Sequence, residues 1–178
     1  AVKKMIVIYE TKSHTAGRDA GYYSRFLCNL ARANTSYLSW HFTVDDSQII
    51  QHIPVGEVAW HAGDGDGGDY NLHAVAIRIC MDPLCDVKEA LHNAALLTAY
   101  LVKKERIPFS GILRPGNWGL KSRPGILQDA GAWQAFLKDC AGEYAKLLSP
   151  ATLPAGEAVP GAIVVVNGRG YKFDSAAG

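Results

Sequence analysis

The sequence predicts an α/β domain in which helices flank a central mixed β-sheet. Short runs rich in β-branched residues alternate along the chain with longer segments whose apolar residues recur at helical spacing. The chain has 178 residues, of which 48% are hydrophobic, and this is enough for one domain with a substantial core.

The first part of the chain predicts strands with one helix among them. MIVIY (5–9) has the composition of a buried strand, and residues 18–33 place apolar side chains on one helical face. WHFTV (40–44), IIQHI (49–53) and EVAWH (57–61) follow as three short strands. These three predict a β-meander whose first turn is the pair Asp45-Asp46.

The segment AVAIRIC (74–80) predicts a strand with two different faces. Val75, Ile77 and Ile79 alternate with three small residues and one arginine, Arg78. We therefore expect Arg78 to border a cleft.

The second half predicts two long helices joined by an irregular loop. Asp86 and Glu89 resemble a capping box, and an apolar stripe continues from them to Pro108. Glycines and prolines break the segment 112–127, and long irregular loops in compact domains are often functional. The apolar residues of the last helix are Trp133, Phe136, Leu137, Cys140, Tyr144 and Leu147.

The last thirty residues differ in composition from the rest. Residues 149–161 contain three prolines, which is typical of a linker or an extended arm. In the tail, Asn167-Gly168 is a hairpin turn signal. We divide the chain into a domain at 1–148, an arm at 149–161 and a short β-hairpin-like tail at 162–178.

Composition argues against several classes of protein. The net charge of +1 and the absence of a basic stripe with interleaved aromatics argue against nucleic acid as a partner. No apolar run approaches the roughly 20 residues of a membrane span, so we expect a soluble protein. The four cysteines lack metal-binding spacing, and we expect buried free thiols, although Cys80 and Cys85 could approach across a turn. The sequence does not indicate an oligomeric state.

The stretch AWHAGDGDGG (59–68) has some features of a calcium loop. Asp64 and Asp66 fit such a loop, whereas Gly68 stands where a third oxygen ligand belongs and Asp69 where the glycine belongs. Calcium is therefore disfavoured.

Three segments resemble the zinc-dependent N-acetylmuramoyl-L-alanine amidases of phage endolysins and bacterial autolysins, which are related to peptidoglycan-recognition proteins. They are SWHFTVDDSQIIQHIP (39–54), AWHAGDGDGGDYN (59–71) and AVAIRIC (74–80), similar to the family's SWHFxVDDxxIxQxIP, AWHAGDG…N and SIGIEIC. The resemblance covers about residues 5–148. It implies the family's fold and a groove for a glycan-peptide substrate, with the AWHAGDG loop as one wall.

The resemblance also implies a zinc site, which in this family serves to cut the amide between muramic acid and L-alanine. Its three ligand positions hold Tyr9 (IVIYET against IVIHxT), Pro115 (ILRPGNW against VxRHxDW) and Arg123 (KSRP against KxCP). Arg78 stands at the glutamate that many members use as a general base, while Lys121 is kept. None of the three replacements is an ordinary zinc ligand, so we predict that zinc and any other cofactor are absent.

The six histidines show no spacing that would rebuild a metal site, and we expect His52 and His92 on solvent faces. We expect a ligand rather than a metal in the groove, where Arg78, Lys121 and Arg123 would form a pocket for a carboxylate. The residues expected to line the groove are Trp40, His41, Trp60, His61, Asn71, Arg78, Trp118, Lys121 and Arg123.

Three functions remain open. The first, which we favour, is a catalytically silent amidase-fold protein that binds peptidoglycan fragments (muropeptides) or another glycan-peptide ligand. The second is an active amidase, a cell-wall hydrolase with a non-standard site, for which Ser122 beside Lys121 is the one candidate nucleophile. The third is a structural or interaction module, such as a phage particle component or an engineered scaffold, with a vestigial groove. We expect a bacterial or phage origin, with action at the cell wall or in the cytoplasm before lysis.

Overall fold

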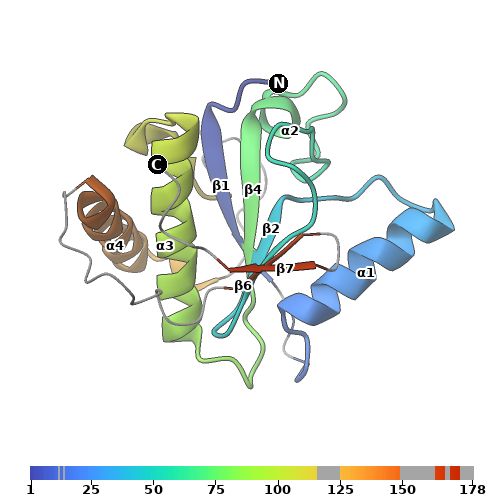
Figure 1. Cartoon of the computed structure of the whole chain (residues 1–178), viewed down its shortest axis with the longest axis horizontal. Helices are drawn as coiled ribbons and strands as arrows, with labels where there is room; N and C mark the ends of the chain where they lie inside the picture. Colours follow the sequence, from blue (N-terminus) through green and yellow to red (C-terminus); the bar gives the residue numbers. More distant parts are fainter. Residues whose placement is uncertain (12, 14, 116–124, 149–162, 167–168, 173–178) are drawn as a thin grey trace.

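The computed structural model describes all residues except 12, 14, 116–124, 149–162, 167–168 and 173–178. Seven strands of the described chain form one mixed sheet, with helices on both of its faces (Figure 1). The predicted fold class is therefore confirmed. In spatial order the strands are β5 (Ile112–Leu113), β1 (Met5–Glu10), β4 (Ala74–Ile79), β2 (Phe42–Val44), β3 (Ile49–Gln51), β6 (Ile163–Val166) and β7 (Arg169–Lys172). The helices are α1 (Ala20–Ala33), α2 (Asp69–His73), α3 (Val87–Glu105) and α4 (Ala130–Leu148), with 3₁₀ turns η1 (Phe109–Gly111) and η2 (Ile126–Gln128).

Three parallel strands at the centre of the sheet bring distant residues side by side. β4 pairs in parallel with β1 on one side and with β2 on the other. In this register Arg78 is the neighbour of both Tyr9 and Thr43. Residues paired in this way point to the same face of a sheet, so Tyr9, Arg78 and Thr43 form a row.

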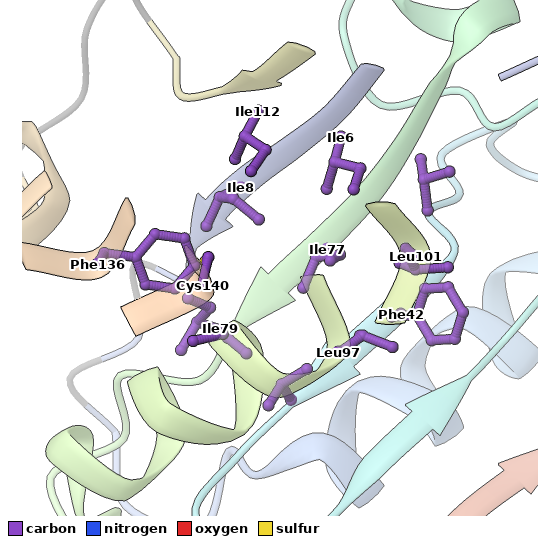
Figure 2. Packing of buried hydrophobic residues seen from close by; sticks show 14 of the residues in the cluster. Ile6, Ile8, Phe42, Ile77, Ile79, Leu97, Leu101, Ile112, Phe136 and Cys140 are labelled. Atoms are coloured by element: carbon purple, nitrogen blue, oxygen red, sulfur yellow. The ribbon is translucent and has the colours of Figure 1, made fainter. Parts of the chain in front are cut away.

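The opposite face carries the main core. Ile6 and Ile8 of β1 and Ile77 and Ile79 of β4 pack there against α3 and α4, where Leu97, Leu101, Phe136 and Cys140 meet them (Figure 2). The two-faced pattern predicted for 74–80 is confirmed, because Val75, Ile77 and Ile79 all belong to this cluster, whereas Ala76 packs with Trp40 on the α1 side.

The Asp45-Asp46 turn fixes the starts of two helices. The buried Asp45 carboxylate accepts hydrogen bonds from the Ala20 N–H (2.9 Å) and from the turn itself, while Asp46 accepts one from the Asp86 N–H (2.8 Å). Asp86 in turn caps α3 through the backbone of Lys88 (3.0 Å), as predicted. Helix α1 begins two residues later than predicted, at Ala20, because Asp19 is its N-cap.

The predicted meander is wrong in its third strand. β2 and β3 form an antiparallel pair, shorter than predicted, but 57–61 holds only an isolated bridge between Trp60 and Leu38. Side chains replace the ladder here, since the Glu57 carbonyl accepts hydrogen bonds from Lys3 Nζ (2.6 Å) and His41 Nε2 (3.2 Å). A segment does not have to pair as a strand when side chains form the hydrogen bonds that its backbone groups need.

In the tail, β6 pairs in parallel with β3 and antiparallel with β7. The arm at 149–161 lies outside the described residues, and the division into domain, arm and tail stays a prediction. All four cysteines are free thiols, as predicted, but only Cys80 and Cys140 are buried, whereas Cys85 is half-buried and Cys28 is exposed. Within the described ranges, no helix has the length and apolar character needed to cross a membrane.

Candidate functional site

An arginine stacked on a buried tryptophan forms the centre of the candidate site. The guanidinium carbon of the half-buried Arg78 lies 4.1 Å from the centre of the Trp40 ring and 5.5 Å from that of Tyr9. Trp40 is 1% exposed, and its Nε1 donates to Thr43 Oγ1 (2.7 Å). A cation held over a partly desolvated aromatic ring gains about 1–2 kcal/mol, so Arg78 has a defined position.

Tyr9 is bonded to His61, which lies beside Arg78. Tyr9 Oη is 2.7 Å from His61 Nδ1, and His61 Nε2 is 3.1 Å from the Tyr70 carbonyl oxygen. A carbonyl can only accept, so Nε2 carries the proton and Nδ1 accepts from Tyr9. Burial, together with the positive charge of Arg78, lowers the pKa of His61 to about 3. His61 is therefore neutral at pH 7, with both ring nitrogens engaged.

The glycine-rich stretch forms a loop that is closed by its own side chains. Gly63 and Gly65 have φ angles of 76° and 86°, which favour glycine. The Asp64 carboxylate accepts from the Tyr70 N–H (2.8 Å) at the start of α2, and a Cβ on Gly68 would collide with it. The aspartates and glycines of 59–68 thus have local structural roles.

Asn71 and His41 are placed differently from expectation. We expected both to contact a ligand, but they are 1% and 0% exposed. The Asn71 side chain accepts from the N–H groups of His61 and Ala62 (2.9 Å each) and donates to the Gly65 carbonyl (2.9 Å). His41 Nδ1 accepts from the Ala76 N–H (3.0 Å). Both side chains hold the walls of the site and do not face a ligand.

The remaining predicted site residues divide into two groups. Trp60 is 37% exposed next to the buried His61, so its ring is accessible. Pro115 is half-buried where the described chain stops before 116–124. Trp118, Lys121 and Arg123 lie outside the described residues, and the proposed convergence of Lys121 and Arg123 on Arg78 stays a prediction.

The residues at this site do not fit zinc. Position 9 holds a phenol that donates to His61, and the cationic Arg78 lies beside this phenol. Position 115 holds a side chain without a donor atom. His61, the nearest histidine, has no nitrogen left for a metal. Among the residues that the structure describes, no group of three histidine, cysteine or acidic side chains could hold a metal ion.

Two residues that the sequence did not single out tether the segments on either side of 116–124. Glu10 accepts from the N–H groups of Ile126 (2.8 Å) and Leu127 (3.3 Å), and burial raises the pKa of its carboxyl. Arg114 stacks over Trp133 (5.5 Å) and donates to the carbonyl of Leu127. An acidic residue at the end of a buried strand, such as Glu10, is a sequence signal for a functional or structural contact. The sequence does not reveal its partners, however, because they lie 116 and 117 positions away.

The order of strands and helices in this mixed sheet agrees with the amidase resemblance seen in the sequence. The family model for N-acetylmuramoyl-L-alanine amidase matches residues 2–126, and the chain belongs to this family.

Its relatives include the N-acetylmuramoyl-L-alanine amidases CwlH and XlyA of Bacillus subtilis (strain 168). CwlH is 39% identical over 132 residues, which are 74% of this chain and 50% of CwlH. XlyA is 35% identical over 131 residues, which are 74% of this chain and 42% of XlyA. The chain thus spans half or less of the length of these relatives.

Solved structures agree with this assignment. The catalytic domain of XlyA superposes with a TM-score of 0.71 at 33% identity, over 78% of this chain and 86% of that domain. PlyL superposes with a TM-score of 0.67 at 27% identity, over 78% of this chain and 84% of PlyL.

Proposed function

We propose that this chain binds peptidoglycan fragments in the groove beside Arg78 and does not hydrolyse them through the zinc chemistry of its family. The observation that carries the proposal is the stacking of Arg78 on Trp40, at the position where the family resemblance implies a general-base glutamate. A fixed cation next to a neutral histidine is suited to hold an anion and is unsuited to abstract a proton from water.

The chemistry of the ligand follows from Arg78 and Trp60. A guanidinium presents five N–H donors in a planar fork that matches a carboxylate. Trp60 adds an accessible ring against which the apolar face of a sugar can pack. A muropeptide carries both groups, because it joins an N-acetylated sugar to a peptide with free carboxylates.

A second candidate is amide hydrolysis. The relatives CwlH and XlyA are named as N-acetylmuramoyl-L-alanine amidases, and these comparisons favour an active amidase over a silent one. Its catalytic groups would have to include residues from 116–124, where Lys121 and Ser122 lie. Action on the bacterial cell wall is common to both candidates.

One set of measurements separates the candidates. Purified protein is analysed for zinc, then incubated with peptidoglycan while released peptides are followed by mass spectrometry. In parallel, muramyl dipeptide with free or amidated carboxyl groups is titrated by calorimetry into the wild type and into Arg78→Ala. Arg25→Ala is the matched control, because Arg25 is an exposed arginine of α1.

We expect less than stoichiometric zinc, no released peptide and a preference for the free carboxyl that Arg78→Ala loses and Arg25→Ala keeps. Peptide release by the wild type would replace this proposal with hydrolysis. If the affinity is the same for free and amidated carboxyl groups and is unchanged in Arg78→Ala, the contact between Arg78 and a carboxylate is refuted. No binding at all would favour a vestigial groove in a structural module.

A further inference from the structure

A cavity lies on the flank of α1, and Arg78 is not among the residues that line it. Its volume is about 510 Å³, within the range of small-molecule sites. The last two turns of α1, the segment 36–39 and the end of β3 line it. His52 forms part of its wall and meets Trp40 edge-on, with ring centres 5.9 Å apart. Trp40 thus contacts both a wall residue of this cavity and Arg78.

The lining combines apolar side chains with a few polar groups, and the one charged side chain among its described residues is a cation. None of the described residues that line it is acidic, and the sequence holds no aspartate or glutamate from 20 to 44. Arg32 lines the cavity from the last turn of α1 and forms no ion pair with another described residue. Ser24 and Gln51 add a hydroxyl and an amide that can hydrogen-bond a ligand.

An exposed aromatic ring lies at the same cavity. Tyr37 is 79% exposed, and its ring centre lies 5.9 Å from that of Trp60 at an angle of 39°. The segment that carries it is held in place, since Ser39 N–H donates to the Trp60 carbonyl (3.1 Å) and Ser39 Oγ accepts from the Trp60 N–H (3.0 Å). A large aromatic side chain left in water on an ordered segment is suited to contact a sugar ring.

We propose that this cavity binds an acidic sugar, with Arg32 on its carboxylate or phosphate and Tyr37 on the apolar face of the ring. The site is separate from the one at Arg78, and the proposal does not depend on the ligand bound there. A cavity with one guanidinium, no acidic lining and small hydroxyl groups favours a single anionic sugar over a cationic or purely apolar ligand.

The test uses isotope-labelled protein and three sugars. N-acetylmuramic acid carries a carboxylate, N-acetylglucosamine 6-phosphate carries a phosphate, and N-acetylglucosamine is neutral. Each is titrated while the NMR signals of His52 and of residues 36–39 are followed. We expect both acidic sugars to shift these signals and to bind about tenfold more tightly than the neutral one. The tighter of the two acids identifies the preferred anion.

Variants assign the contacts. We expect Arg32→Gln to lose about tenfold in affinity for the acidic sugars only, and Tyr37→Ser to weaken all three sugars. Arg25→Gln is the matched control, because Arg25 is an exposed arginine two turns earlier on α1 that is not part of the cavity lining, and it should bind as the wild type does.

Three results would overturn the proposal: no shifts up to about 20 mM sugar, equal affinity for acidic and neutral sugars, or equal affinity in Arg32→Gln and Arg25→Gln. If acidic sugars instead leave the His52 signals unchanged and their binding is lost in Arg78→Ala, they occupy the groove at Arg78. That outcome would support the proposed function while refuting this one. Conversely, shifts at His52 that survive Arg78→Ala would support this cavity whatever the groove binds.

Discussion

Acidification should destabilise the fold, because two histidines are buried in their neutral form. Burial lowers the pKa of His41 and of His61 from 6.5 to about 3 each. Their side chains are 0% and 8% exposed, and both donate Nε2–H to a carbonyl and accept at Nδ1. A proton on Nδ1 would break the accepted bond and place a charge in the interior.

The sign and size follow from proton linkage. Between about pH 3 and pH 6.5 the unfolded chain binds protons at these histidines that the folded chain does not, so stability falls as the pH falls through this window. From about pH 7 to about pH 5, each histidine removes about 2 kcal/mol from the free energy of unfolding. Together they remove about 4 kcal/mol, a large part of the stability of a typical domain. Glu10 has the opposite effect on the free energy of unfolding. Its raised pKa means that the folded chain binds this proton more tightly than the unfolded chain does.

Urea denaturation at the two pH values, followed by tryptophan fluorescence, measures this loss. The substitution His61→Gln keeps one donor and one acceptor but does not titrate. The variant should therefore lose about 2 kcal/mol less than the wild type between the two pH values. The contribution of Glu10 cancels in this comparison. His92→Gln is the matched control, since His92 is exposed, and it should lose as much as the wild type.

Equal pH dependence in the wild type and in His61→Gln would refute the reasoning. It would mean that the folded protein protonates His61 as readily as the unfolded chain does. The bond from Tyr9 would then not hold the ring in the neutral form, and the description of the site would need a charged histidine next to Arg78.

Three further outcomes are expected. The combined change Tyr9→His, Pro115→His and Arg123→Cys should take up zinc, measured by calorimetry, while single changes should not; a folded triple variant without zinc would show that 112–127 follows a different path from the family's. Asn71→Ala should cost about 3 kcal/mol in urea denaturation, because three buried hydrogen bonds are lost, and a loss below 1 kcal/mol would contradict its role in the loop. Phe136→Ala should cost about 3–5 kcal/mol in the same assay, because this ring is 3% exposed and stacks on Trp133; a loss typical of a surface substitution would contradict its place in the core.

The fold was predictable wherever one local pattern determines one element. The alternation in 74–80 identified both faces of β4, and Asp86 identified the start of α3, because periodicity and capping are short-range properties. The segment 57–61 has the same apolar pattern, yet Lys3 and His41 satisfy its backbone at Glu57 instead of a neighbouring strand. A local sequence pattern cannot predict the hydrogen bond between Lys3 and Glu57, because the two residues are 54 positions apart.

The resemblance assigned Tyr9 and Arg78 to two positions of one family site but did not predict their contacts. The structure places them side by side and adds that His61 bonds to Tyr9. His52 was expected on a solvent face, but it is half-buried against Trp40, and burial lowers its pKa to about 4. Whether a histidine in a half-polar segment faces water depends on tertiary neighbours that the sequence does not reveal.

The residues at the positions where the family resemblance implies a zinc site form one consistent arrangement. In a zinc amidase the ion would link the end of the first strand to neighbouring segments, because one metal bonds several ligands at once. Here Tyr9 makes a direct bond to His61, and Arg78 stacks between Tyr9 and Trp40. These contacts join the same strands without an ion, and the charge of Arg78 would oppose any cation that entered. Arg78 stays in every one of these variants, so a single restored ligand would have to hold the ion alone against this charge, whereas three ligands hold it together. This is the physical reason for expecting only the combined reversion to take up zinc.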